Sequence, residues 1–238
     1  MLSKNDSLKI LAFDTSSTRG SAALLEGKLL RAEFRSDSSA THSTLLLKAV
    51  DFLLECAGWK LQEIGLVASG IGPGSFTGIR IGVATGLGLA QSLGIPFAGV
   101  SGLDVLARRA AWDRNFDGRI GVLLDARRNQ VYFAKYESRA GRIHQMCKPA
   151  LVDVANLLDC LEDVSMAAGD LGDDLLKSLG RSRPDLKWVP ADLFLAEGIG
   201  RLALERKRTW RTGEVLMSEP MYIRPPDAVR NAIKNKHG

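Results

Sequence analysis

The chain has 238 residues, of which 45% are hydrophobic and 25% charged, with a formal net charge of +5. This composition is typical of a globular domain, and the length allows one large domain or two smaller lobes with a core that needs no disulfide staples. The positive charge permits contact with nucleic acid without requiring it. Charged and polar residues interrupt the longest apolar run, which excludes a membrane span.

Cysteine usage and the N-terminal sequence indicate where the protein works. The three cysteines, Cys56, Cys147 and Cys160, are odd in number and widely spaced, which favours a reducing compartment with buried or inert thiols. The N-terminal residues MLSKNDSLKI contain no apolar segment of the kind a secretory signal needs. We therefore expect a cytoplasmic protein.

The first elements in chain order are a strand, a polar turn and a second strand. Residues 9–14 (KILAFD) form a short apolar run that ends in Asp14 and predicts a buried strand. A hydroxyl-rich turn follows over 15–20, and residues 21–26 predict the returning strand. The tip of such a hairpin can hold a phosphate, although short hydroxyl turns are common and this pattern alone is weak.

A helix and a strand come next. Apolar residues with a period of 3.6 predict a helix over 38–59, which Thr41 can cap, and a strand is expected over 64–69. His42 falls in the first turn of that helix. A lone histidine there is more typical of a surface or interface residue than of a metal ligand, because no ligand partner is near in sequence.

The most distinctive stretch is a glycine-rich loop and helix over residues 69–94, SGIGPGSFTGIRIGVATGLGLAQSLG. Ser75 is a plausible N-cap of the helix. Each interior glycine costs roughly 0.8–1 kcal/mol relative to alanine, so a close neighbour must offset the loss. Either the helix packs closely on another backbone, or the loop N–H groups and helix N-terminus face an anion within reach of Arg80. The small residues that recur every fourth position on one face are Gly78, Gly82, Gly86 and Ala90.

The pattern then restarts, which indicates an internal repeat. A strand over 95–100 and a helix over 101–111 complete a strand–helix–strand unit and a mixed or parallel sheet. Residues 119–125 (RIGVLLD) again form an apolar run ending in an acid, followed by a turn and a strand over 131–136. We favour duplication into two lobes, and the alternative is chance similarity between two hairpins.

The second half of the chain is less regular. A proline-flanked connection is expected over 183–190, and the tail from Tyr222 is proline-broken and basic. The basic run near residue 211 is more typical of a solvated helix end than of an RNA-binding patch. The remaining expected elements are a helix over 152–161, a strand over 165–168, a turn over 169–172 that opens another helix, and a helix over 191–211.

Familiar catalytic motifs are missing from the sequence. The glycine loop lacks the Gly-Lys-Ser/Thr of a P-loop, and GxSxG, CxxC and HExxH do not occur. Asp14 and Asp125 can face each other across a cleft, as paired acids do in phosphoryl-transfer sites, but no lysine or histidine base is placed beside them. The residues alone therefore indicate a two-lobed, nucleotide-fold-like protein without a convincing catalytic centre.

Five segments together resemble the TsaB (YeaZ) family of tRNA threonylcarbamoyladenosine biosynthesis proteins, non-catalytic paralogues of TsaD. The most specific piece is GPGSFTGIRIG. The resemblance implies an α/β fold of two lobes, like the actin-like, sugar kinase and Hsp70 (ASKHA) ATPases, with duplicated βββαβα lobes of which the second is reduced. The implied domains are an N-terminal lobe over 8–112, a smaller lobe over 113–223 and a basic tail over 224–238. The segments are KILAFDTSSTRGSAAL, THSTLLLKAVDFLL, SGIGPGSFTGIRIGVATGLGLAQSLGIPFAGVSGLDVLA, LLDARRNQVYFAKY and PMYIRPPD.

The resemblance also implies a role. The chain would be a non-catalytic scaffold or activator that binds TsaD in the complex forming N6-threonylcarbamoyladenosine in tRNA next to the anticodon. The metal-binding histidine pair of TsaD has no counterpart in residues 100–104 (VSGLD), so no catalytic residue and no metal ligand is expected. The implied partners are TsaD, the ATPase TsaE, a second copy of the chain when TsaD is absent, and tRNA through the complex. The chain itself would require no cofactor, and ATP or ADP could bind at the interface of the complex.

Two sets of site residues follow from the resemblance and the motifs. Helices over 41–55 and 75–93 would pack against the partner, which would explain the glycine stripe. The predicted interface residues are His42, Leu45, Leu46, Ala49, Phe76, Gly78, Ile79, Gly82, Val83 and Gly86. The predicted nucleotide- or anion-binding residues are Asp14, Thr15, Ser16, Ser17, Gly72, Gly74, Arg80 and Asp125.

Two alternatives stay open at this point. The chain could be a stand-alone nucleotide-binding phosphotransferase or hydrolase that uses Asp14 and Asp125. It could also be an M22-type glycoprotease, although no nucleophile–base pair or metal-ligand set supports that activity.

Overall fold

The computed structural model describes residues 7–37, 42–112, 115–206 and 223. The chain forms two compact units, Met1–Arg109 with Asp192–Met221, and Ala110–Ala191 with Tyr222–Gly238. This division differs from the expected domains 8–112 and 113–223, because the chain returns to the first unit after Ala191. The predicted basic tail, 224–238, lies outside the described residues.

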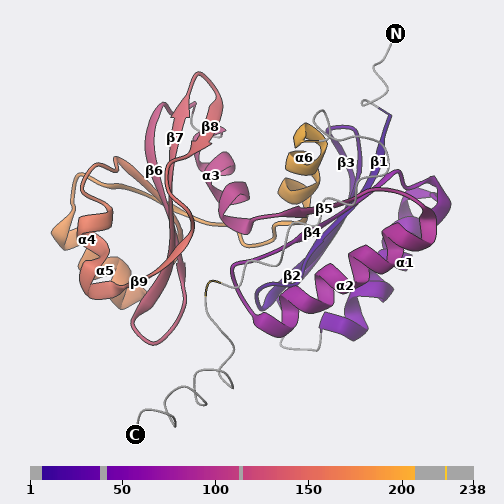
Figure 1. Ribbon diagram of the computed structural model, residues 1–238, viewed down its shortest axis with the longest axis horizontal. Coiled ribbons are helices and arrows are strands. Elements are labelled where there is room, and N and C mark those ends of the chain that lie inside the picture. Colours follow the sequence, from indigo (N-terminus) through magenta and orange to yellow (C-terminus); the bar gives the residue numbers. More distant parts are fainter. Residues whose placement is uncertain (1–6, 38–41, 113–114, 207–222, 224–238) are drawn as a thin grey trace, which may run out of the picture. The chain divides into compact units, whose positions relative to one another are not determined.

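The first unit contains a five-stranded mixed sheet (Figure 1). Its order is β3-β2-β1-β4-β5, with antiparallel pairing of β1–β2 and β2–β3 and parallel pairing of β1–β4 and β4–β5. β3 was not expected, because its sequence LLRAEFRSD is charged and half-exposed, as suits an edge strand. The strands are β1 (Lys9–Asp14), β2 (Arg19–Glu26), β3 (Leu29–Asp37), β4 (Leu66–Gly70) and β5 (Phe97–Val100).

Helices cover both faces of this sheet. α1 (His42–Ala57) and α2 (Phe76–Leu93) share a core with one face, while α6 (Ala196–Arg206) contacts the strands and packs on the other face (Figure 1). A Cβ built on Gly200 would lie 2.5 Å from Leu25 Cδ1 and 3.2 Å from Ala12 Cβ. This close packing of α6 on the sheet explains why the chain returns to the first unit. The unit also contains η1 (Leu61–Glu63) and the greater part of α3 (Gly102–Trp112).

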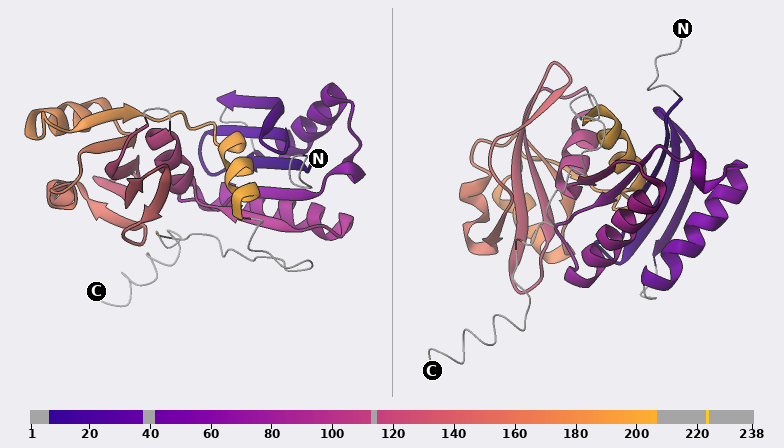
Figure 2. Two further views of the ribbon diagram at one scale, coloured as in Figure 1. Left: turned by 90° about the horizontal axis from the view of Figure 1, so that it is seen from above. Right: turned by 45° about the vertical axis from the view of Figure 1, so that its right-hand side comes forward.

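The second unit has a sheet of its own (Figure 2), and the topology of this sheet repeats that of the first. Its sheet has the order β8-β7-β6-β10-β11, again with an antiparallel meander on one side and parallel strands on the other, and β9 also pairs with β7. The duplicated α/β fold is therefore confirmed, and the second copy is reduced because α4 is only four residues long. The elements are β6 (Gly118–Asp125), β7 (Gln130–Arg139), β8 (Arg142–Gln145), β9 (Ala150–Asp153), η2 (Val154–Asn156), α4 (Leu157–Cys160), β10 (Met166–Asp170), α5 (Asp173–Ser182) and β11 (Lys187–Pro190).

Three expectations for the second half of the chain were wrong. The helix predicted over 152–161 begins as strand β9, in which Val152 pairs with Val131 of β7. The connection predicted over 183–190 contains strand β11, which pairs in parallel with β10. Short apolar runs fit both a strand and a helix, so neighbouring strands decide the outcome. The helix predicted over 191–211 begins only at Ala196, and its last residues lie outside the described chain.

The glycine stripe of α2 faces the sheet of its own unit. A Cβ on Gly78 would overlap the backbone oxygen of Thr15, and one on Gly82 would lie 2.6 Å from Thr15 Oγ1 and 2.9 Å from Ser69 Oγ. At Gly86 the added atom would lie 2.5 Å from Phe97 Cε2. The close neighbour that the stripe requires is therefore the β1–β2 turn and the strands beneath the helix.

We predict opposite stability changes for two alanine substitutions in α2. Gly78→Ala should lower the free energy of unfolding by about 1–3 kcal/mol, because the new methyl group overlaps a backbone atom that cannot swing away. Gly88→Ala should raise it by roughly 0.5–1 kcal/mol, because no atom lies within 4 Å of its Cβ position and alanine is the better helix former. Urea unfolding of the full chain measures both, and equal effects would contradict the packing assigned to the stripe.

Candidate functional site

The candidate site centres on the turn after β1, where Asp14 ends the strand. Asp14 is fully buried (0% exposed). Its Oδ1 accepts the N–H of Ser16 at 3.2 Å, and its Oδ2 accepts the Ser16 hydroxyl at 3.0 Å. An aspartate side chain that binds the backbone two residues ahead fixes the turn. A cavity of about 20 Å³ adjoins Asp14, Thr15 and Ser21, which is space for about one water molecule.

The glycine-rich loop is fastened to this turn. Thr15 Oγ1 donates to the backbone oxygen of Gly78 at 2.7 Å, and Ser75 N donates to the backbone oxygen of Ser16 at 2.6 Å. A Cβ on Gly74 would overlap that same Ser16 oxygen. The Ser75 hydroxyl caps α2 by accepting the N–H of Gly78 at 3.2 Å. The β1–β2 turn, the glycine loop and the start of α2 are therefore held together by hydrogen bonds.

These hydrogen bonds affect the predicted anion-binding site at the glycine loop. Around the loop, Ile71 N donates to Val100 O at 3.0 Å and Gly102 N donates to Gly72 O at 2.8 Å. Together with Ser75 N, these donors are satisfied by the protein's own carbonyl oxygens, and so are poorly placed to receive a phosphate. These bonds do not involve the N–H groups of Gly74, Phe76 and Thr77, so the anion-binding assignment stays a prediction.

The other predicted anion-site residues are held in different surroundings. Ser17 Oγ accepts the N–H of Arg19 at 3.1 Å, and the Arg80 guanidinium lies 3.7 Å from the centre of the Phe76 ring. Asp125 ends β6 in the second unit, is exposed, and accepts the N–H of Arg127 at 2.6 Å. Asp14 belongs to the first unit and Asp125 to the second, and their predicted pairing stays a prediction.

The predicted interface residues lie mostly on the buried side of α1 and α2. Leu46, Ala49, Ile79 and Val83 are between 1% and 8% exposed. The stripe Gly78, Gly82 and Gly86 is buried on the sheet, which corrects the idea that a partner subunit explains it. Leu45 and Phe76 are half-buried, and the side chain of His42 is not described.

The outer face of the two helices carries residues that the sequence analysis did not single out. Leu47 is 50% and Phe52 56% exposed on α1. On α2, the small residues Ala84 and Gly88 are exposed. The sequence did hold a signal for this face, because α1 has more large apolar residues than one buried stripe uses.

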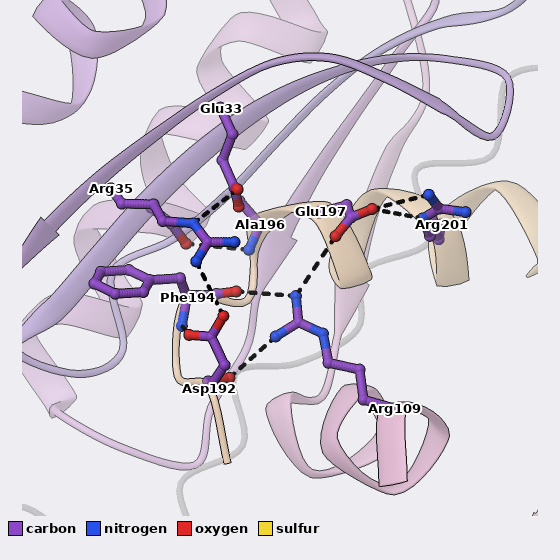
Figure 3. Close-up of polar contacts among 9 residues, drawn as sticks. Glu33, Arg35, Arg109, Asp192, Phe194, Ala196, Glu197 and Arg201 are labelled. Atoms are coloured by element: carbon purple, nitrogen blue, oxygen red, sulfur yellow. Dashed lines mark hydrogen bonds and ion pairs between the residues drawn. The ribbon is translucent and has the colours of Figure 1, made fainter. Parts of the chain in front are cut away.

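A second cluster of side chains fixes the start of α6 on the first unit (Figure 3). Arg109 of α3 donates to the backbone oxygens of Asp192 and Phe194, each at 3.0 Å. Arg35 of β3 donates to Asp192 Oδ2 at 3.1 Å and lies 5.2 Å from the centre of the Phe194 ring. Its hydrogen bond to Glu33 raises the pKa of Arg35 above the usual value. No sequence motif indicates this cluster, because the contacts of Arg109 and Arg35 with Asp192 and Phe194 join residues more than 80 positions apart.

Two arginine substitutions in this cluster should lower the free energy of unfolding by different amounts. Arg109→Ala should lower the free energy of unfolding by about 1–3 kcal/mol, because two carbonyl groups lose a charged donor. Arg201→Ala removes a partly exposed i,i+4 pair with Glu197 and should lower the free energy of unfolding by about 0.5 kcal/mol or less. Urea unfolding compares the two variants. A loss for Arg109→Ala as small as that for Arg201→Ala would show that Arg109 does not anchor α6.

Metal binding and membrane crossing can both be judged over the described ranges. Over those ranges, no three His, Cys, Asp or Glu side chains are grouped so that they could hold a metal ion. His237 lies outside the described residues. Among the described helices, none is long and apolar enough to cross a bilayer.

Comparisons with known proteins give consistent results. The family model for TsaD, tRNA N6-adenosine threonylcarbamoyltransferase, matches residues 36–173. The tRNA threonylcarbamoyladenosine biosynthesis protein TsaB of Escherichia coli is 38% identical over 224 residues, which cover 91% of this chain and 95% of that protein. TsaB of Bacillus subtilis is 36% identical over 167 residues, covering 70% of this chain and 72% of that protein.

Solved structures agree with the sequence comparisons. YeaZ from Pseudomonas aeruginosa is 27% identical, with a TM-score of 0.68, and the match covers 85% of this chain and 93% of that chain. A protein from the same organism, described as similar to peptidase YeaZ, is 28% identical with a TM-score of 0.70 and coverage of 91% and 100%. A ROK family protein from Streptococcus pneumoniae, at 11% identity, TM-score 0.54 and coverage of 85% and 100%, shares the fold alone.

The duplicated topology and the likeness to the ROK family protein define a fold of the actin-like, sugar kinase and Hsp70 (ASKHA) class. Within that class, the chain belongs to the TsaB (YeaZ) family of tRNA threonylcarbamoyladenosine biosynthesis proteins. The predicted resemblance and fold class are thereby confirmed.

Proposed function

We propose that this chain is a non-catalytic subunit that binds and activates the catalytic TsaD in the complex that forms N6-threonylcarbamoyladenosine in tRNA next to the anticodon. The observation that carries the proposal is the contrast within the first unit. In its interior, the β1–β2 turn is hydrogen-bonded to the glycine loop and to the start of α2. Its outer helix face exposes Leu47 and Phe52.

The chemistry at the interior site supports a non-catalytic role. Asp14 is fully buried and engaged with Ser16, so it is poorly placed to act on a substrate. Directly after β5, where the resemblance places the metal histidines of TsaD, the chain has Ser101, Gly102, Leu103 and Asp104. A serine and an aspartate in that stretch do not replace a histidine pair as ligands for a catalytic metal.

The outer face of α1 and α2 has the character of a protein–protein interface. Phe52 and Leu47 would supply apolar anchors, and Ala84 and Gly88 on α2 would let a partner helix approach closely. Around the helix, the exposed charged residues Lys48, Asp51 and Glu55 lie between Leu47 and Phe52, so the partner would also have to meet these charges.

The other members of the proposed complex are inferred from the resemblance to the TsaB family. TsaE would join as the ATPase, tRNA would bind through the complex, and ATP or ADP would bind at its interface without being a cofactor of this chain. A second copy of the chain would occupy the same outer face when TsaD is absent. The complex would work in the cytoplasm.

Substitution of exposed leucines tests the proposed interface. Leu47→Glu should weaken TsaD binding about tenfold or more, because a charge replaces an exposed apolar side chain in the proposed contact. Leu158→Glu, which changes a 44% exposed leucine on α4, should leave the affinity unchanged. Calorimetric titration of each full-length variant with TsaD measures the affinities, and circular dichroism checks that both variants fold. Equal affinities for the two variants would remove the outer face of α1 from the interface.

The activity itself separates an activator from a stand-alone enzyme. Threonylcarbamoyl transfer to tRNA would be measured with this chain alone, with TsaD alone and with both, in the presence of TsaE and ATP throughout. The proposal predicts product only when both chains are present. Product from this chain without TsaD, or ATP turnover by the purified chain that Asp14→Asn abolishes, would favour the alternative of a phosphotransferase or hydrolase.

A further inference from the structure

The hairpin of β7 and β8 in the second unit carries two arginines directly opposite each other. A two-residue turn of Ala140 and Gly141 joins the strands, and Arg139 pairs with Arg142 in the ladder. Both turn residues have positive φ, 49° and 71°, as a type I′ turn requires. The N–H of Ala140 donates to Asp117 Oδ1 at 2.9 Å. The turn is therefore held in place, and its tip projects from one end of the second unit (Figure 1).

The side chains of Arg139 and Arg142, the arginine pair, project from the same face of the sheet. Residues opposite each other in an antiparallel ladder have Cβ atoms only about 4.5–5.5 Å apart, and like charges at such positions destabilise the ladder. Both arginines are exposed. Within the described ranges, neither forms an ion pair with a carboxylate within 4.0 Å. An anion bound between the two guanidinium groups would offset their repulsion.

The segment around the arginine pair is basic as well. Residues 138–149, SRAGRIHQMCKP, contain the arginine pair, Lys148 and no acidic residue. Two acidic residues adjoin the hairpin. Asp117 accepts the N–H of the turn, and Glu137 lies opposite His144 in the ladder, two residues before the arginine pair on the same face. The tip itself therefore presents positive charge alone.

The composition of the tip favours a nucleic-acid backbone over a protein surface as the source of the anion. Protein interfaces depend on aromatic or large apolar anchors, and Ala140 is the only side chain between the two arginines. The exposed Met146 follows the far end of β8. A guanidinium binds a phosphate through two parallel hydrogen bonds, and phosphate contacts supply affinity without apolar burial. Two neighbouring guanidinium groups on one face therefore suit successive phosphates of one strand.

We propose that the β7–β8 hairpin is a direct RNA-binding site of this chain, in which the arginine pair binds backbone phosphates without reading the base sequence. The identity of the RNA as tRNA rests on the proposed function, whereas the contact with phosphates does not. This contact adds a direct one to the expected binding of tRNA through the complex. RNA and TsaD would then bind to different units of the chain, the second unit and the α1–α2 face of the first.

The test measures the binding of a fluorescently labelled tRNA transcript to the full-length chain by anisotropy at several salt concentrations. The double variant Arg139→Gln/Arg142→Gln should bind about tenfold or more weakly than the wild type. The slope of log K against log salt concentration should become shallower by about 2, because two phosphate contacts are lost. The thermal unfolding midpoint of this variant should not fall, because the substitutions remove a repulsion.

A matched control removes two exposed charges elsewhere in the second unit. Lys177→Gln/Arg181→Gln makes the same change in net charge on α5, beside Asp173 and Asp174. It should change the affinity for the transcript less than about twofold, because these cations lie among acidic residues rather than in a basic segment. An equal loss in both double variants would mean that net charge alone governs binding, which would overturn the proposal.

Three further results would overturn it. They are absence of transcript binding by the wild-type chain at about 50 mM salt, equal affinities of the wild type and the hairpin variant, and displacement of the transcript by polyglutamate as readily as by unlabelled RNA of equal charge. The last result would assign the hairpin to an acidic protein surface. Calorimetric titration of the hairpin variant with TsaD, which should match the wild type, keeps this inference separate from the proposed function. TsaD binding without arginine-dependent RNA binding would contradict the inference alone, and the reverse would contradict the proposed function alone.

Discussion

The contact between the start of α2 and the turn after β1 is the constraint on which the rest of the first unit depends. The backbone of Thr15 can approach α2 only because Gly78 and Gly82 have no side chains. The Thr15 hydroxyl and the Ser75 N–H then bond across the junction. Because these groups satisfy one another, the helix is held against the sheet and the glycine loop has fewer donors to offer a ligand.

Because of that contact, the two faces of the layer formed by α1 and α2 have different roles. The inner face, with the glycine stripe and Ile79, belongs to the core of the unit. The outer face is left to carry Leu47 and Phe52, which the sheet cannot cover. The first unit therefore joins the turn and the glycine loop by hydrogen bonds on its inner side and exposes apolar side chains on its outer side, and the proposed role as a partner-binding subunit depends on the outer side.

The sequence predicted those parts of the fold that local patterns determine. The buried strands over 9–14 and 119–125 were evident because each is an apolar run ended by an acid and a turn. β3 and β11 were missed because edge strands are short or charged and depend on their neighbours for their conformation. Periodicity placed Gly78, Gly82 and Gly86 on one face of α2, but it could not say whether a sheet or another subunit covers that face. The Arg109 contacts were out of reach because they join distant parts of the chain.

The most direct test of this account is amide hydrogen exchange of the full-length chain with and without TsaD. The account predicts that α2 is already protected in the chain alone, since the sheet covers its glycine stripe, and that TsaD adds protection chiefly along α1 and the outer face of α2. Rapid exchange throughout α2 in the chain alone, with protection acquired only on addition of TsaD, would contradict it. Such a result would mean that the partner, rather than the chain's own sheet, provides the close contact that the glycines require.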